Sequence, residues 1–195
     1  QLEASGIDYN KIAVVDGSTL IRWDAPNFFD LAPDNKLTVF RSLENLRWIS
    51  EGIAGYKEFF NNFDFNMSHY IDCGFQIFDK SYKPFLTKLE KFYDDNYDSI
   101  MHLQNNAVKK GTDQPVYNYL LRIENIDVYT GLPPAFMINH MTRFDWFSHN
   151  WQLNEDKTPF FIKYGYIWKY SGFPQRGDRY NLMQQTWELI KKNYE

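Results

Sequence analysis

Short apolar runs that favour β-strands recur along the chain, each bounded by turn-forming residues. The β-branched run from Lys11 to Val15 opens on Asp16-Gly17, as a buried strand does where it meets a loop. Gly74 interrupts a longer run at 71–78 and permits the close approach of another group. Together with similar runs, the pattern predicts strands at 11–15, 19–22, 37–40, 71–78, 126–129 and 166–170.

Between these runs, apolar residues follow the 3.6-residue period of amphipathic helices. Ser42 predicts the N-cap of one helix, and Thr112 predicts the N-cap of another. Residues 82–96 and 179–193 show the same period. Alternating strands and helices predict an α/β fold with three layers, in which helices flank a mixed sheet. In the helix that Ser42 caps, the expected apolar positions are Leu43, Leu46, Ile49, Ile53 and Tyr56. In the helix at 82–96, they are Leu86, Leu89 and Tyr93.

Composition narrows the class of protein. No repeat and no Gly/Ser-rich linker marks a boundary, so we expect residues 1–195 to form one domain. A net charge of -4 lacks the Lys/Arg excess of nucleic-acid-binding proteins. No apolar run reaches the roughly 20 residues of a membrane-spanning helix. Because Cys73 has no partner for a disulfide and no secretory signal is visible, we expect a cytoplasmic protein.

Asp16 is the first residue that suggests chemistry. In open α/β sheets, ligands collect outside the carboxyl ends of strands, where an acidic side chain can hold a metal ion or a ribose hydroxyl. Asp-Gly after a strand is also an ordinary turn. Asp16 alone therefore leaves a binding site and a structural turn both open.

The order of the motifs along the chain favours a binding site at Asp16. Asp16-Gly17-Ser18 is followed by an aromatic strand segment at 70–78, by Asp113-Gln114 with Asn118, by Leu132-Pro133 leading to Asn139, and by the segment 169–172. This series resembles the motifs of GT-A nucleotide-sugar glycosyltransferases, in particular glycogenin-like and galactosyltransferase-like relatives of family 8. The resemblance implies a GT-A-like domain that transfers a sugar from a nucleoside-diphosphate sugar to a carbohydrate or other hydroxyl acceptor.

The resemblance also assigns roles to individual residues. Asp113 and Gln114 correspond to the pair that contacts the donor sugar or the reacting centre, and helix capping is the structural alternative. The other implied roles are donor binding by Asp16, Ser18, Asp72, Lys169, Gly172 and Arg176, and acceptor binding by His140 and Trp168. Structural alternatives remain open for these too: a hydrogen-bonded strand-end carboxylate for Asp72, a solvated basic loop for Arg176, a satisfied structural histidine for His140 and a core indole for Trp168.

Two departures from the family concern the metal ion. Ser18 stands where the family has its second acid, and Lys169 stands where it has a metal-binding His. Asp16 is then the remaining candidate ligand for Mn²⁺ or Mg²⁺, and we expect little need for either cation. Lys169, Arg176 and Arg179 are candidates to offset the charge of the diphosphate directly.

Length provides a further expectation. The family has a nucleotide-binding βαβ segment before its acidic motif, whereas fifteen residues precede Asp16. We therefore expect the chain to be N-terminally incomplete, with an uncovered apolar surface beside residues 11–15 through which it self-associates or binds a partner.

Three classes of function are compatible with these observations. The first is a glycosyltransferase, and the second is a non-catalytic carbohydrate-binding or scaffolding module that kept the fold. The third is a structural α/β domain of another family. The first requires Asp16, Asp72, Asp113 and Gln114 to converge on one concave site, whereas the third places them on different faces.

Overall fold

The computed structural model describes residues 2–42, 46–109, 113–133, 138–139, 155, 157–170 and 176–195. The chain forms two compact units, and each is built from two separate stretches of sequence. Unit 1 comprises Gln1–Val14 and Ala32–Gly131, and unit 2 comprises Val15–Leu31 and Leu132–Glu195. Within the described residues, no helix is long and apolar enough to cross a membrane.

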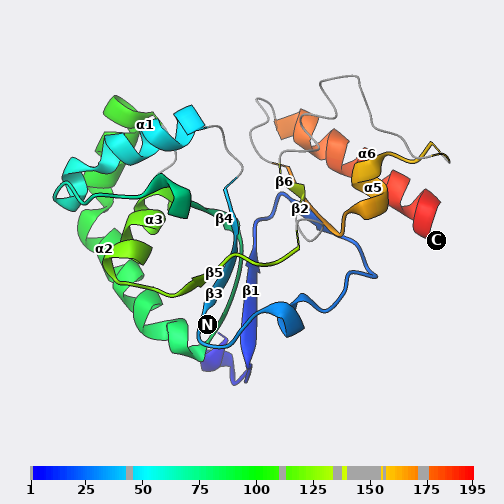
Figure 1. Cartoon of the computed structure of the whole chain (residues 1–195), viewed down its shortest axis with the longest axis horizontal. Helices are drawn as coiled ribbons and strands as arrows, with labels where there is room; N and C mark the ends of the chain where they lie inside the picture. Colours follow the sequence, from blue (N-terminus) through cyan, green and yellow to red (C-terminus); the bar gives the residue numbers. More distant parts are fainter. Residues whose placement is uncertain are drawn as a thin grey trace. The chain divides into compact units, whose positions relative to one another are not determined.

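Unit 1 contains a four-stranded sheet, as far as the chain is described, in the order β1-β4-β3-β5 (Figure 1). The strands are β1 (Lys11–Val15), β3 (Leu37–Arg41), β4 (Ile71–Asp79) and β5 (Val128–Tyr129). β3 pairs antiparallel with β4 and parallel with β5, so the sheet is mixed. The predicted α/β class with a mixed sheet and flanking helices is confirmed.

Three longer helices of unit 1 lie together on one side of this sheet (Figure 1). They are α1 (Leu46–Tyr56), α2 (Lys83–His102) and α3 (Asp113–Ile123). Their apolar faces pack on the strands in one core, in which Phe60 stacks on Tyr119 with ring centroids 4.5 Å apart. Shorter turns complete the unit: η1 (Glu3–Ser5), η3 (Glu58–Phe60), η4 (Met67–His69), η5 (Lys80–Tyr82) and η6 (Leu103–Val108).

The predicted helix faces agree with the packing except at one end. Ile49, Ile53 and Tyr56 of α1 are buried, but Leu46 is 68% exposed. Leu46 is the first residue of α1 and lies beyond the part of the helix that covers the sheet, so its prediction as a core residue was wrong. Leu43 and Thr112 lie outside the described residues.

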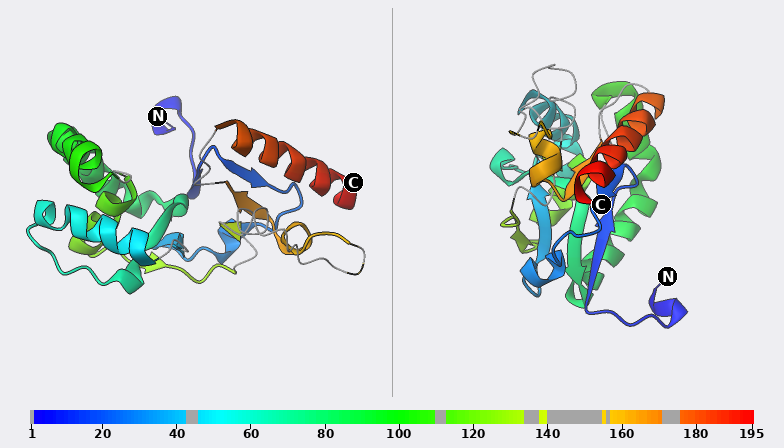
Figure 2. Two further views of the ribbon diagram at one scale, coloured as in Figure 1. Left: turned by 90° about the horizontal axis from the view of Figure 1, so that it is seen from above. Right: turned by 90° about the vertical axis from the view of Figure 1, so that its right-hand side faces the viewer.

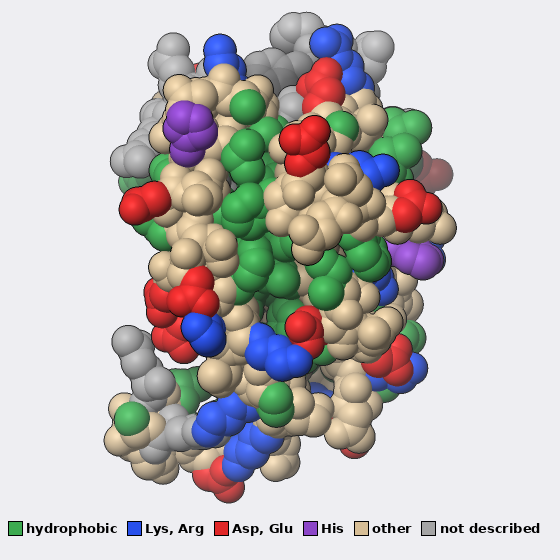
Figure 3. All heavy atoms as spheres, turned by 90° about the vertical axis from the view of Figure 1, so that its left-hand side faces the viewer, with side chains coloured by type: hydrophobic (Ala, Val, Ile, Leu, Met, Phe, Trp, Pro, Cys, Tyr) green, Lys and Arg blue, Asp and Glu red, His purple; other side chains and the backbone are tan. Residues whose placement is uncertain are grey.

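The outer faces of unit 1 carry apolar side chains in two grooves. One, of about 240 Å³, runs between α2 and α3 and includes Phe85, Leu89 and Phe92; the band of hydrophobic side chains on this helical face is visible in Figure 3. The other, of about 490 Å³, lies beside the edge strand β1 and includes Ile12 and Val14. Val14 is 47% exposed. Self-association through the surface beside β1 stays a prediction.

Unit 2 contains a smaller sheet, whose described strands have the order β2-β7-β6. They are β2 (Thr19–Ile21), β7 (Ile167–Lys169) and β6 (Ile138–Asn139), and β7 is antiparallel to β2 and parallel to β6. The core of the unit joins β2 and β7 to the helices α5 (Phe160–Tyr164) and α6 (Arg176–Tyr194) (Figure 2). A short turn, η2 (Phe28–Leu31), belongs to the same unit.

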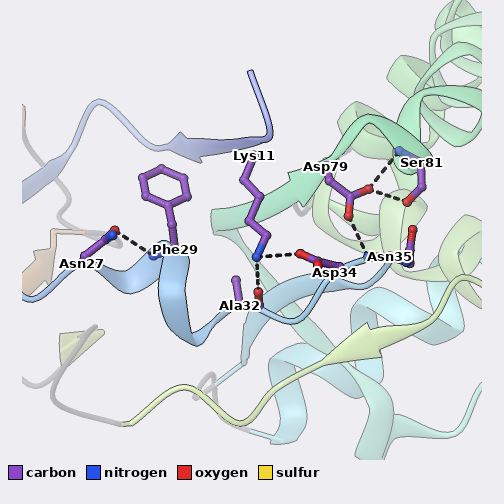
Figure 4. A network of polar contacts seen from close by, with 8 residues as sticks. All are labelled: Lys11, Asn27, Phe29, Ala32, Asp34, Asn35, Asp79 and Ser81. Atoms are coloured by element: carbon purple, nitrogen blue, oxygen red, sulfur yellow. Dashed lines mark hydrogen bonds and ion pairs between the residues drawn. The ribbon is translucent and has the colours of Figure 1, made fainter. Parts of the chain in front are cut away.

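A polar network fixes the turns around β1, β3 and β4 in unit 1 (Figure 4). The Lys11 ammonium donates to the Ala32 carbonyl and lies 2.8 Å from Asp34 Oδ1. The Asp79 carboxylate accepts from the backbone N–H groups of Asn35, at 2.6 Å, and Ser81, at 2.9 Å. Burial raises the pKa of Asp79, but hydrogen bonds from Ser81 and Asn35 and the charge of Lys11 outweigh it, so the pKa lies below its ordinary value.

We expect Asp79→Asn to lower the free energy of unfolding at pH 7. The charged form of Asp79 stabilises the native state, and this contribution is complete above the ordinary pKa of 3.8. It is lost as the pH falls through the lower pKa of the folded chain. Urea unfolding of both proteins between pH 7 and pH 3 should therefore give a difference that shrinks in acid. A difference that is constant across this range would contradict the prediction.

Candidate functional site

Asp16 and Lys169 form an ion pair in unit 2. The Lys169 Nζ lies 3.1 Å from the Asp16 Oδ2, and the side chains are 7% and 49% exposed respectively. Asp16 directly follows β1, and Lys169 is the last residue of β7. Residues from near the two ends of the sequence therefore meet at one point.

Strand pairing explains why the sequence folds in this way. β2 and β7 pair with Thr19 opposite Lys169, and the Tyr170 N–H donates to the Ser18 carbonyl at 2.8 Å. These contacts hold the Asp16–Ser18 turn against the end of β7. Lys169 lies on the strand between β2 and β6, which accounts for the burial of its side chain. A buried ammonium is costly without a compensating negative charge, and Asp16 provides one.

Trp168, the neighbour of Lys169, is a core residue of unit 2. Its ring has no exposed area, and its Nε1–H donates to the Phe161 carbonyl at 2.7 Å. Successive residues of a strand point to opposite faces, so the side chains of Trp168 and Lys169 leave β7 in opposite directions. We therefore leave Trp168 out of the acceptor site and retain the core interpretation.

The other candidates of unit 2 are described only in part. Gly172 and His140 lie outside the described residues, as does the side chain of Arg176, which begins α6. Arg179, in the first turn of α6, has a buried Nε for which the described part of the structure provides no hydrogen-bond partner.

Asp113 and Gln114 open helix α3 in unit 1, and Asn118 fixes their position. The buried Asn118 side chain accepts from the Ile71 N–H at 2.8 Å. Its Nδ2 donates to the Ile71 carbonyl at 3.0 Å and to the Gln114 carbonyl at 2.8 Å. One amide thus ties the first turn of α3 to the start of β4, and it brings the Asp72 segment and the Asp113-Gln114 pair together.

Asp72 is 2% exposed, and its Oδ1 accepts from the Gly74 N–H at 2.6 Å. It is the second residue of β4, so it lies at the amino end of this strand. The antiparallel pairing of Arg41 with Ile71 places Asp72 close to the carboxyl end of β3. The contact with Gly74 is the kind that the structural alternative for Asp72 predicts.

Two tyrosines near Asp113 were not predicted as site residues. The Tyr93 hydroxyl donates to the Asp113 carbonyl at 3.3 Å. Tyr56 is fully buried, and its pKa is raised by burial and, to a smaller extent, by the Asp113 carboxylate. In the described part of the structure, its hydroxyl and the Gln114 Nε2 have no hydrogen-bond partner. In the sequence, Tyr56 continues the apolar face of α1, so no signal separates it from a core residue.

The structure therefore describes the candidate site as two groups. Asp16, Ser18 and Lys169 belong to unit 2, and Asp72, Asp113 and Gln114 belong to unit 1. Their convergence on one concave site stays a prediction. Among the described residues, no group of three or more His, Cys, Asp or Glu side chains could hold a metal ion.

Comparison with known proteins gives a structural likeness of low sequence identity. No family model matches the chain, and no curated protein matches it. Among solved structures, the apo structure of the WbbM bifunctional glycosyltransferase is similar to this chain, with a TM-score of 0.47 and 14% sequence identity. The likeness covers 94% of this chain and 34% of that one, so this chain spans about a third of its length. At this TM-score, the likeness establishes neither a family nor an activity.

Proposed function

We propose that the chain belongs to a glycosyltransferase that transfers a sugar from a nucleoside-diphosphate sugar to an acceptor hydroxyl. The contact between Asp16 and Lys169 carries the proposal. The resemblance to the GT-A enzymes places both residues in one donor site from motifs near opposite ends of the sequence. Their 3.1 Å ion pair supports that placement, because an accidental match of motifs gives no reason for them to meet.

Each group of residues has a role in the proposed reaction. The diphosphate leaving group gains negative charge as the glycosidic bond breaks, and a fixed cation offsets that charge. Lys169 supplies it, and Arg176 and Arg179 are further candidates. Asp113 and Gln114 contact the donor sugar: the carboxylate accepts hydrogen bonds from sugar hydroxyls, and the Gln114 amide donates one. Asn118 holds their turn in place.

A metal ion would use the same turn. Asp16 offers the carboxylate oxygens that Mn²⁺ and Mg²⁺ prefer, whereas the Ser18 hydroxyl is a poorer ligand. The protonated Lys169 cannot coordinate a cation and repels one at this distance. This set of groups fits a diphosphate better than it fits a divalent cation, so we propose transfer with little need for metal.

The runner-up function is a carbohydrate-binding or scaffolding module without catalysis. Ser18 in place of an acid and an Asp16 already paired with lysine are the observations that favour it. The two functions differ in one product, because only an enzyme releases a nucleoside diphosphate from its donor.

The test is sugar transfer by the complete protein with a panel of nucleoside-diphosphate sugars and acceptors, with and without EDTA. We expect Asp113→Asn and Gln114→Ala to lower kcat by about 10²- to 10³-fold, because each removes a contact made to the reacting sugar. Asp98→Asn, which changes an exposed acid of α2, is the control and should leave kcat unchanged. Oligosaccharide binding without release of nucleoside diphosphate from any donor would favour the non-catalytic module.

A further inference from the structure

The members of the Asp16–Lys169 pair differ in how firmly they are held. Lys169 lies on the strand between β2 and β6, and its side chain is 7% exposed. Asp16 lies in a turn, and its side chain is 49% exposed. A rotation about the side-chain bonds of Asp16 carries its carboxylate into water, whereas the ammonium has little room to follow.

The cost of separating the pair is equally unequal. The half-exposed Asp16 carboxylate costs little to separate, because water already reaches it and replaces the lost contact. Loss of a charged partner costs a largely buried ammonium more, because little water can replace it. Opening of the pair is therefore favoured when another anion takes the place of Asp16, and that anion approaches from the side on which Asp16 is exposed.

We infer that Asp16 competes with the donor's diphosphate for the Lys169 ammonium, so that binding exchanges one anion for the other. This inference rests on the proposed function. A diphosphate carries more charge and more acceptor oxygens than one carboxylate, so it wins the exchange at sufficient concentration. Asp16 weakens binding twice, by occupying the ammonium and by repelling the incoming anion.

Removal of the Asp16 charge should therefore change the affinity for the donor in the opposite direction to removal of a metal ligand. A carboxylate that binds the donor through a divalent cation is needed for donor binding, so its removal weakens binding. A carboxylate that competes with the diphosphate hinders binding, so its removal strengthens it. Asp16→Asn separates the two because the amide keeps the shape of the side chain and loses its charge.

The experiment measures the affinity of the complete protein for inorganic pyrophosphate by calorimetry, in EDTA and then with Mn²⁺. We expect Asp16→Asn to bind at least about tenfold more tightly than the wild type, as for removal of a like charge a few ångströms away. Lys169→Met should bind at least about tenfold more weakly, and Lys169→Arg within a few-fold of the wild type. Asp30→Asn and Lys192→Met change exposed charges of the same unit and should leave the affinity unchanged.

Thermal unfolding guards against a variant that is merely unstable. Asp16→Asn removes a negative charge that compensates the buried Lys169 ammonium, so the melting temperature of the variant should fall. Saturating pyrophosphate should raise the melting temperature of the variant by more than it raises that of the wild type. Equal or weaker binding by Asp16→Asn would overturn the inference, as would binding that needs Mn²⁺ and is lost in Asp16→Asn.

The same measurements separate this inference from the proposed function. Pyrophosphate binding with the expected order of variants, but without sugar transfer from any donor, would uphold the anion exchange and reject the glycosyltransferase. Metal-dependent sugar transfer that is lost in Asp16→Asn would uphold the glycosyltransferase and reject the anion exchange.

Discussion

Replacing Asn118 with Leu is expected to lower the free energy of unfolding by about 3 kcal/mol, because two buried backbone groups lose their partner. The Asn118 side chain is fully buried and bonds both the N–H and the carbonyl of Ile71. Leu has a similar volume, so the change removes hydrogen bonds and leaves little cavity. Urea unfolding measures the loss.

Asn96→Leu is the matched control for this prediction. Asn96 in α2 also donates to the carbonyl four residues earlier, at 2.8 Å from Phe92 O, but no strand contact is shown for it. We expect a loss below about 1 kcal/mol there. Similar losses in the two variants would mean that the contact with Ile71 contributes nothing beyond the bond within the helix. If transfer is found, Asn118→Leu should also lower kcat, because the Asp113-Gln114 turn loses its attachment to β4.

The main strands and helices could be predicted because their apolar patterns are local. The run at 11–15 became β1 with the predicted bounds, and those at 37–40 and 71–78 became β3 and β4 within one residue. The ends of helices were harder to place. The predicted helix at 82–96 continues to His102, since Ile100 is buried in the core and adds a contact beyond a polar stretch.

The division into two units could not be read from the sequence. Its boundaries fall after Val14, inside β1, after Leu31, at the end of η2, and after Gly131, beyond β5. No change of composition accompanies any of these points, because both units use the same kinds of apolar residues. Each unit assembles from segments far apart in the chain, so its limits depend on long-range packing.

The candidate site shows the same contrast between local and long-range features. The motifs singled out Asp16 and Lys169 separately, yet their ion pair depends on the pairing of β2 with β7. Asn118 was quoted as part of a motif, and its bonds to Ile71 require α3 to lie against the start of β4. A single sequence contains no signal for such pairings.

Trp168→Ala is expected to cost about 3 to 5 kcal/mol in unfolding free energy, the usual range for deleting a buried indole. The ring has no exposed area and packs in the core of unit 2 with Phe161, Leu182 and Ile190. Its Nε1–H also satisfies the Phe161 carbonyl, in a helix too short to pair all of its own carbonyls. Trp168→Phe keeps most of the volume and loses this bond, so we expect about 1 to 2 kcal/mol.

Trp23→Ala provides the control, because Trp23 belongs to the same unit and is 48% exposed. The loss of unfolding free energy in Trp23→Ala should stay below about 1 kcal/mol.

Urea unfolding of the variants separates the two interpretations of Trp168. A core indole gives a large loss of stability, with any loss of acceptor binding following only from unfolding. A ring that stacks on the acceptor gives the opposite result, with stability near that of the wild type and acceptor affinity reduced in the folded protein. The side chains of Trp168 and Lys169 leave β7 in opposite directions, so a destabilised but folded Trp168→Phe should still bind pyrophosphate.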